Sequence, residues 1–137
     1  MDMEIQQEES GYTLKRNQLL KYMLVIIDSG HGINTPGKCS PDKQFKEWKY
    51  CRELADLLSE ALLEQDFGVV NLMHGIDNDE SLRSRCKRIN KIVAQVKDCI
   101  VISLHNNAAG ADGKWHNATG WSVFVSMNAS ANSKLAA

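Results

Sequence analysis

Two histidines in this chain each follow an apolar run of strand length. His31 comes shortly after the run at residues 24–27 and lies between two glycines. His105 comes directly after the run at residues 99–104. Because an α/β protein places its chemistry at the carboxyl ends of its strands, two neighbouring parallel strands ending in this way would bring both imidazoles to one edge of the sheet.

A carboxylate is predicted to face the core at the start of a helix. Glu47 precedes Cys51 by four residues and Leu54 by seven, which is the spacing of one helix face. An inward carboxylate is costly unless another group pairs with it. The alternative is that Glu47 only complements the positive N-terminus of the helix, and spacing does not decide between the two.

Two imidazoles and one carboxylate make up a catalytic-type zinc set, in which the fourth position stays open for water or substrate. Neutral imidazole and carboxylate oxygen both suit this metal. The sequence therefore makes His31, Glu47 and His105 candidate ligands of Zn2+. His74 and His116 lie in predicted turns, and we treat them as background.

The elements that must position these residues alternate between strand and helix patterns, which favours an α/β layer fold. Strands are predicted at residues 22–28, 68–73, 98–104 and 120–126, and helices at 45–65 and 81–97. The second helix is expected to turn an apolar stripe inward, made of Leu82, Cys86, Ile89, Val93 and Val96. Residues 1–21 are predicted to be a flexible extension and residues 22–137 a single domain.

The composition excludes several classes of partner. A net charge of −1 over 137 residues gives no electrostatic case for nucleic acid, and no apolar run reaches membrane-spanning length. The first twenty residues lack the apolar centre of a signal peptide, so we expect a chain that is cytoplasmic at synthesis. The four cysteines form no CxxC pair, which argues against a structural zinc knuckle.

The motifs in their order and spacing resemble the zinc-dependent N-acetylmuramoyl-L-alanine amidases of the amidase-3 type. The resemblance covers the chain from about Leu24 to its end. It is carried by Ile26-Ile27-Asp28-Ser29-Gly30-His31-Gly32, Pro36-Gly37, Glu47, Ser81-Leu82-Arg83-Ser84-Arg85, Asn90, Ile102-Ser103-Leu104-His105-Asn106-Asn107-Ala108 and Gly120-Trp121.

The resemblance implies a mixed, mainly parallel sheet with helices on both faces, and zinc held by His31, Glu47 and His105. It also implies peptidoglycan as the substrate, with hydrolysis of the amide between N-acetylmuramic acid and L-alanine. Such an enzyme would act at the cell wall if it is exported or released. Asn106, Asn107 and Trp115 are candidate substrate contacts, although the two asparagines have the alternative role of capping their own loop.

One feature of the family pattern is missing from the sequence. In the family a glutamate on a late strand acts as the general base, and no acid follows Asp112 here. We therefore expect a chain that is truncated before this strand, binds zinc and is weak or inactive as a hydrolase. An exposed sheet edge would then favour self-association. The alternatives are a catalytically inactive peptidoglycan-binding module that retains the zinc site, and a zinc hydrolase that acts on another amide.

Overall fold

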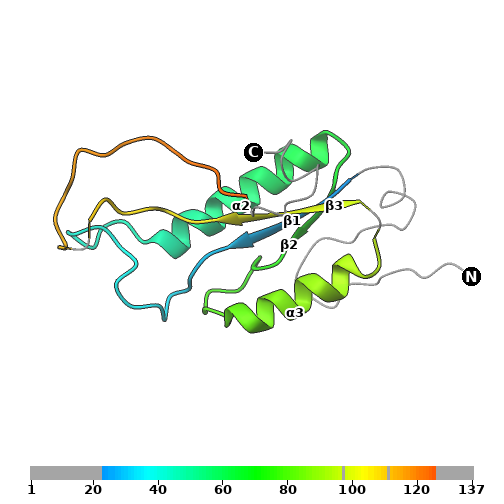
Figure 1. Cartoon of the computed structure of the whole chain (residues 1–137), viewed down its shortest axis with the longest axis horizontal. Helices are drawn as coiled ribbons and strands as arrows, with labels where there is room; N and C mark the ends of the chain where they lie inside the picture. Colours follow the sequence, from blue (N-terminus) through cyan, green and yellow to red (C-terminus); the bar gives the residue numbers. More distant parts are fainter. Residues whose placement is uncertain (1–22, 97, 111, 126–137) are drawn as a thin grey trace, which may run out of the picture.

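Five elements follow one another in the computed structural model, which describes residues 23–96, 98–110 and 112–125. They are β1 (Leu24–Ser29), α2 (Glu47–Glu64), β2 (Gly68–Asn71), α3 (Leu82–Val93) and β3 (Cys99–Leu104), shown in Figure 1. These bounds lie within a few residues of the predicted ones. The predicted extension at residues 1–21 is outside the described residues.

The three strands form a parallel sheet in the order β2-β1-β3. All six residues of β1 are buried, as expected for an uninterrupted apolar run at the centre of a covered sheet. The register pairs Ser29 at the end of β1 with Leu104 at the end of β3. The two strands therefore end side by side at one edge of the sheet.

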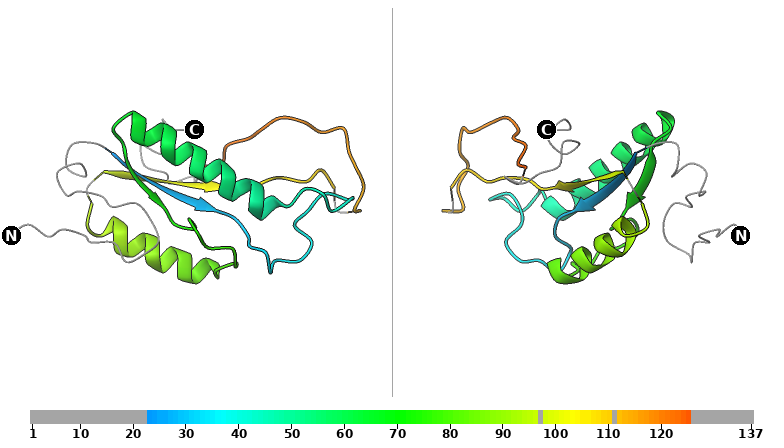
Figure 2. Two further views of the ribbon diagram at one scale, coloured as in Figure 1. Left: turned by 180° about the vertical axis from the view of Figure 1, so that it is seen from behind. Right: turned by 45° about the vertical axis from the view of Figure 1, so that its right-hand side comes forward.

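The helices cover opposite faces of this sheet, α2 on one side and α3 on the other (Figures 1 and 2). Alternate residues of β1 serve the two faces. Val25 and Ile27 pack with Ala55 of α2, while Leu24 and Ile26 pack towards Ile89 and other apolar residues on the α3 side. The predicted α/β fold with helices on both faces is confirmed, and the three described strands are all parallel.

The face that α3 turns inward differs from the predicted one. Of the predicted stripe, Leu82, Cys86 and Val93 are exposed, whereas Ile89 and Val96 pack against the core together with Ile92, and Arg85 is buried. The rotation has a polar cause, because Arg85 Nη1 donates to both carboxylate oxygens of Asp28 at 2.6 and 2.7 Å. A stripe chosen by apolar residues alone therefore missed the side that carries the ion pair.

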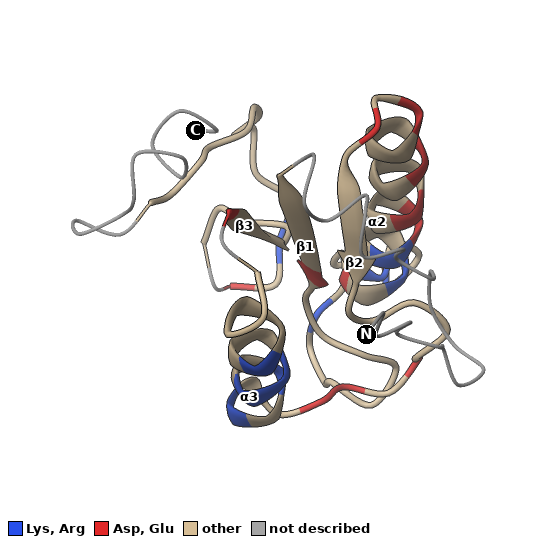
Figure 3. Ribbon diagram, turned by 90° about the vertical axis from the view of Figure 1, so that its right-hand side faces the viewer, with Lys and Arg blue, Asp and Glu red and all other residues tan. Residues whose placement is uncertain are grey.

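Helix α2 is mainly acidic and α3 is basic, although α2 also carries Arg52 and Lys49, which lies 4.0 Å from Glu53. Figure 3 shows Asp and Glu along the outer side of α2, and Lys and Arg gathered on α3. Two of these arginines, Arg85 and Arg88, bind acidic partners, Asp28 and Glu80. Arg88 also donates to the carbonyl of Leu72 at 2.8 Å. The basic run of α3 thus anchors the fold as well as facing solvent.

The predicted strand at residues 120–126 is wrong in its described part. Residues 120–125 form no strand, and the side chains of Trp121 and Phe124 are 85% and 83% exposed. β-Branched and aromatic residues favour a strand only where a neighbouring strand completes the ladder. Among the described residues β3 pairs with β1 alone, so self-association through this sheet edge stays a prediction.

Neither helix in the described part of the chain is long and apolar enough to cross a membrane.

Candidate metal centre

His31 lies in the turn that leaves β1, two residues past its last strand residue. Gly30 N–H donates to the carbonyl of Leu104 at 2.9 Å, which extends the pairing of β1 with β3 by one step. His31 then takes a left-handed backbone conformation, with φ of 63°. Such a conformation costs a non-glycine residue about 1–3 kcal/mol and persists only where the surroundings hold it.

Glu47 is the first residue of α2, and its side chain is buried. Lys46 precedes it without a side-chain cap, and the Glu47 N–H donates to the carbonyl of Lys38 at 3.1 Å. The carboxylate therefore stands at the positive end of the helix and also faces inward. Both interpretations of the sequence therefore apply to Glu47, which faces the core and also complements the helix N-terminus.

His105 follows β3 directly, so the parallel register brings it beside His31, as predicted. The two ring centroids are 5.0 Å apart and the rings meet edge to face, at 84°. The His105 side chain is 42% exposed, whereas the His31 side chain is largely covered. The group therefore opens to solvent on the His105 side.

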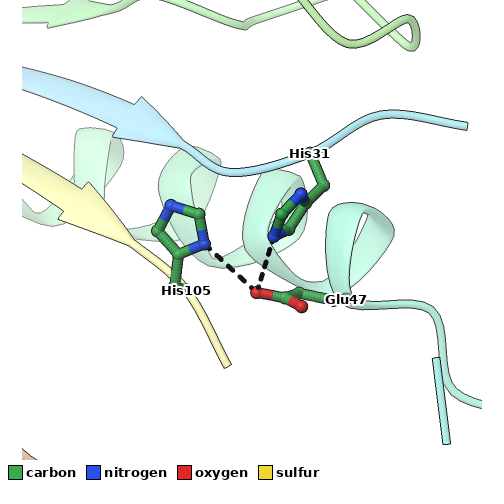
Figure 4. A group of neighbouring side chains, drawn as sticks. All are labelled: His31, Glu47 and His105. Carbon is green, nitrogen blue, oxygen red and sulfur yellow. Dashed lines mark hydrogen bonds and ion pairs between the residues drawn. The ribbon is translucent and has the colours of Figure 1, made fainter. Parts of the chain in front are cut away.

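The three predicted ligands converge on one carboxylate oxygen (Figure 4). Glu47 Oε1 lies 3.4 Å from His31 Nε2 and 3.2 Å from His105 Nδ1. The same oxygen accepts a hydrogen bond from the Asn106 N–H at 2.9 Å. The buried carboxylate of Glu47 is thus paired and not isolated. These partners offset the free-energy cost of burying it, as the sequence led us to expect.

These residues fit a zinc ion. One ligand atom from each of the three residues lies within 4.8 Å of the others. Ligands about 2.0–2.1 Å from a tetrahedral metal are separated from one another by roughly 3.3–3.4 Å. The two separations from Glu47 Oε1, 3.4 and 3.2 Å, are close to this value. The donor set is therefore that of a three-ligand zinc site, two of its separations match a tetrahedral metal, and all three ligand atoms lie within 4.8 Å of one another.

The electrostatics of His31 favour the form that binds metal. Burial lowers the pKa of the His31 imidazole below its ordinary value, and Glu47 opposes this effect in part. The nearby His105 and Lys38 lower the pKa further. Since a metal needs a neutral imidazole, this ring is prepared for binding at neutral pH.

Cys51, one helical turn after Glu47, is buried and contacts Asn106, which follows His105. Its thiol donates to Asn106 Oδ1 at 3.4 Å. Burial, and then the charge of Glu47, raise the pKa of Cys51 to about 11. The thiol is therefore neutral, and it orients Asn106 rather than acting as a nucleophile.

The three candidate substrate contacts, Asn106, Asn107 and Trp115, differ in how closely they are joined to the His–Glu–His group. Asn106 belongs to it through its backbone, and Asn107 Nδ2 reaches Ser122 Oγ at 3.5 Å. Trp115 is 70% exposed in the segment that follows. The hydrogen bonds of the asparagines agree with a role in shaping their loop, and contact with substrate stays a prediction for all three.

The two background histidines are paired elsewhere. His74 Nδ1 lies 2.9 Å from Asp56 Oδ1, and His116 Nε2 lies 2.9 Å from Asp112 Oδ1. Neither belongs to the three-residue group.

Gly30→Ala is expected to damage the site, because a Cβ at Gly30 would overlap the imidazole of His105. The ring would have to leave its present place beside Gly30, so we expect zinc affinity to fall by about 10–100-fold, as when a supporting residue is lost. Gly37→Ala is the control, since Gly37 has open space around it. Because Gly37 has a φ of 73°, this control should lose stability while keeping its zinc affinity. Equal zinc affinities for the two variants would contradict the prediction.

The fold is a parallel α/β sheet that carries a His–Glu–His group, a candidate metal site, at the carboxyl ends of β1 and β3. Comparison with known families places the chain more narrowly. The model of the family Amidase_3, N-acetylmuramoyl-L-alanine amidase, matches residues 25–137. The chain therefore belongs to this family of peptidoglycan amidases. Searches of curated proteins and of solved structures found no match.

Proposed function

We propose that this protein is a zinc-dependent amidase that hydrolyses the bond between N-acetylmuramic acid and L-alanine in peptidoglycan. The observation that carries the proposal is the convergence of His31 Nε2 and His105 Nδ1 on the buried oxygen of Glu47, in a chain of the amidase family. These three residues would hold the metal.

Zinc bound there would supply a Lewis acid that polarises the scissile carbonyl and lowers the pKa of water. The protein's own residues provide the charge and the hydrogen bond that the site needs. The Glu47 carboxylate brings a negative charge that offsets part of the metal's charge, and the Asn106 N–H holds its oxygen in position. The substrate would approach from the His105 side, which is the exposed one.

The proposed substrate contacts come from the segment of the chain that follows His105. Asn106 and Asn107 follow His105 directly, and the exposed Trp115 offers an apolar ring. A flat indole suits packing against a sugar or a stem peptide, while amide groups suit its polar edges. We propose that Asn107 and Trp115 act in this way.

The experiment measures zinc content and amide cleavage on the same preparations. Wild type, His105→Ala and the control His116→Ala are incubated with purified peptidoglycan, with zinc or with a chelator. We expect about one zinc per chain, and newly exposed alanine amino groups, for wild type and for His116→Ala. His105→Ala should lose both the zinc and the product.

Other outcomes contradict the proposal in different ways. A folded wild type that binds no zinc would rule out the metal site. Zinc binding with retention on cell wall but no product would favour the inactive binding module. Cleavage of a peptide that lacks muramic acid would favour another zinc hydrolase. The same assay tests the sequence-based expectation that turnover by this chain is slow.

A further inference from the structure

We propose that Arg52 is a positioning residue that holds the backbone of His31 ready for the metal. The inference rests on the proposed metal site, since it concerns how one of its ligands is placed. Arg52 is buried in the first half of α2, five residues after Glu47. Its side chain runs beneath the turn that carries His31.

The guanidinium binds successive carbonyls at the end of β1. Nη1 donates to the carbonyl and the hydroxyl of Ser29, both at 2.8 Å, and makes a longer contact of 3.5 Å with the carbonyl of Gly30. Nη2 donates to the carbonyl of His31 at 2.7 Å. Nε donates to the carbonyl of Ile76 at 3.0 Å, which ties in the connection between β2 and α3.

These hydrogen bonds satisfy carbonyl groups at the point where β1 leaves the sheet. Buried carbonyls beyond the last paired residue require donors, and a single guanidinium presents five N–H groups in a planar fork. A lysine ammonium is a compact point charge and does not span the same acceptors. The geometry therefore calls for arginine in particular.

The contact with His31 falls on the strained residue itself. His31 has a φ of 63°, a conformation that its surroundings must hold. The shortest of the Arg52 hydrogen bonds, at 2.7 Å, goes to the carbonyl of this residue. Since Glu47 lies on the same helix, α2 supplies one ligand and fixes the turn of another.

The acceptors of Arg52 distinguish it from an ordinary buried ion pair. All five of its hydrogen bonds go to neutral oxygens of backbone or hydroxyl groups. The other buried arginine, Arg85, instead neutralises the carboxylate of Asp28. Arg52 thus shapes the backbone at the metal site, while Arg85 stabilises the scaffold on the opposite face.

The test compares Arg52→Lys with Arg85→Lys, which removes the same fork from the other buried arginine. Zinc affinity is measured by competition with a chromophoric chelator, and unfolding by urea is followed on metal-free protein. We expect Arg52→Lys to bind zinc at least about tenfold more weakly, the size of effect seen for residues that support a ligand. Arg85→Lys should lose stability yet bind zinc within about threefold of wild type.

A measurement on wild type keeps the inference testable if Arg52→Lys does not fold. The Nη–H protons of Arg52, which are donated to Ser29 and His31, should exchange slowly with solvent by NMR in metal-free protein, and equally slowly after zinc is added. The Nη–H protons of the exposed Arg83 serve as the reference for fast exchange.

Two results would overturn the inference. One is a zinc affinity of Arg52→Lys that falls no further than that of Arg85→Lys. The other is a set of Arg52 Nη–H protons that exchange as fast as those of Arg83 in metal-free protein, because the hydrogen bonds to the turn of His31 would then not exist before the metal binds. A wild type that binds no zinc is a different failure, which counts against the proposed function.

Discussion

Glu47→Gln is expected to lower zinc affinity by more than about a hundredfold while the protein stays folded. Loss of a residue that merely supports a ligand costs about 10–100-fold, so loss of a charged direct ligand should cost more. Glutamine keeps the size of the side chain and still offers an oxygen to the Asn106 N–H, which Glu47 Oε1 binds at 2.9 Å. The loss at the helix N-terminus is only about 0.3–1 kcal/mol of stability.

The measurement for Glu47→Gln is zinc affinity by competition with a chelator, alongside the circular dichroism spectrum of the metal-free protein. Glu53→Gln is the matched control, because Glu53 is an exposed carboxylate on the same helix. It should bind zinc as wild type does. If Glu47→Gln kept wild-type affinity, Glu47 would not be a metal ligand, and its burial would reflect helix capping and hydrogen bonding alone.

Arg85→Met is expected to destabilise the fold by about 3–5 kcal/mol, because it leaves the Asp28 carboxylate buried without its partner. Arg85 and Asp28 are both almost fully buried, and Ser103 Oγ lies 3.2 Å from the same carboxylate. The pair joins β1 to α3, and Ser103 brings in β3. A loss of this size is a large part of the roughly 5–15 kcal/mol that stabilises a typical domain.

Urea unfolding of metal-free protein measures this effect. Arg83→Met, an exposed position on the same helix, should change stability by no more than about 0.5 kcal/mol. The double variant Asp28→Leu with Arg85→Met should recover much of the loss, since a matched apolar pair leaves no buried charge. An Arg85→Met protein as stable as wild type would show that water or another group satisfies Asp28.

The effects on zinc affinity and on stability arise on opposite faces of the sheet, since Glu47 lies on α2 and Arg85 on α3. Along β1, Asp28 turns to Arg85 of α3, while the turn after Ser29 is held by Arg52 of α2. The scaffold and the candidate metal site therefore meet at the carboxyl end of the central strand. Variants on the α3 side should alter stability first, and variants on the α2 side should alter metal binding first.

Local patterns were sufficient to locate the candidate ligands. The apolar runs before His31 and His105 predicted two strands, and parallel pairing then required the two histidines to meet. Glu47 was predicted to face inward from its place on the helical stripe, and it is buried. These inferences succeeded because strand ends and helix faces follow from residues only a few positions apart.

The prediction at residues 120–126 failed for the opposite reason. Trp121, Phe124 and their neighbours have high strand propensity, yet a strand exists only where another strand offers its backbone groups. That condition depends on distant parts of the chain. No periodicity within the segment reports on it.

By itself, the sequence determined the order of the five elements from β1 to β3, the three candidate ligands and the family to which the chain belongs. The tertiary structure alone decided which arginines turn inward and what they hold. Arg52 finds its acceptors 21 to 24 residues away, and Arg85 finds Asp28 57 residues away. The physical reason is that a local pattern predicts an arginine to be exposed to solvent. Only long-range packing supplies the buried oxygens that stabilise its guanidinium in the interior.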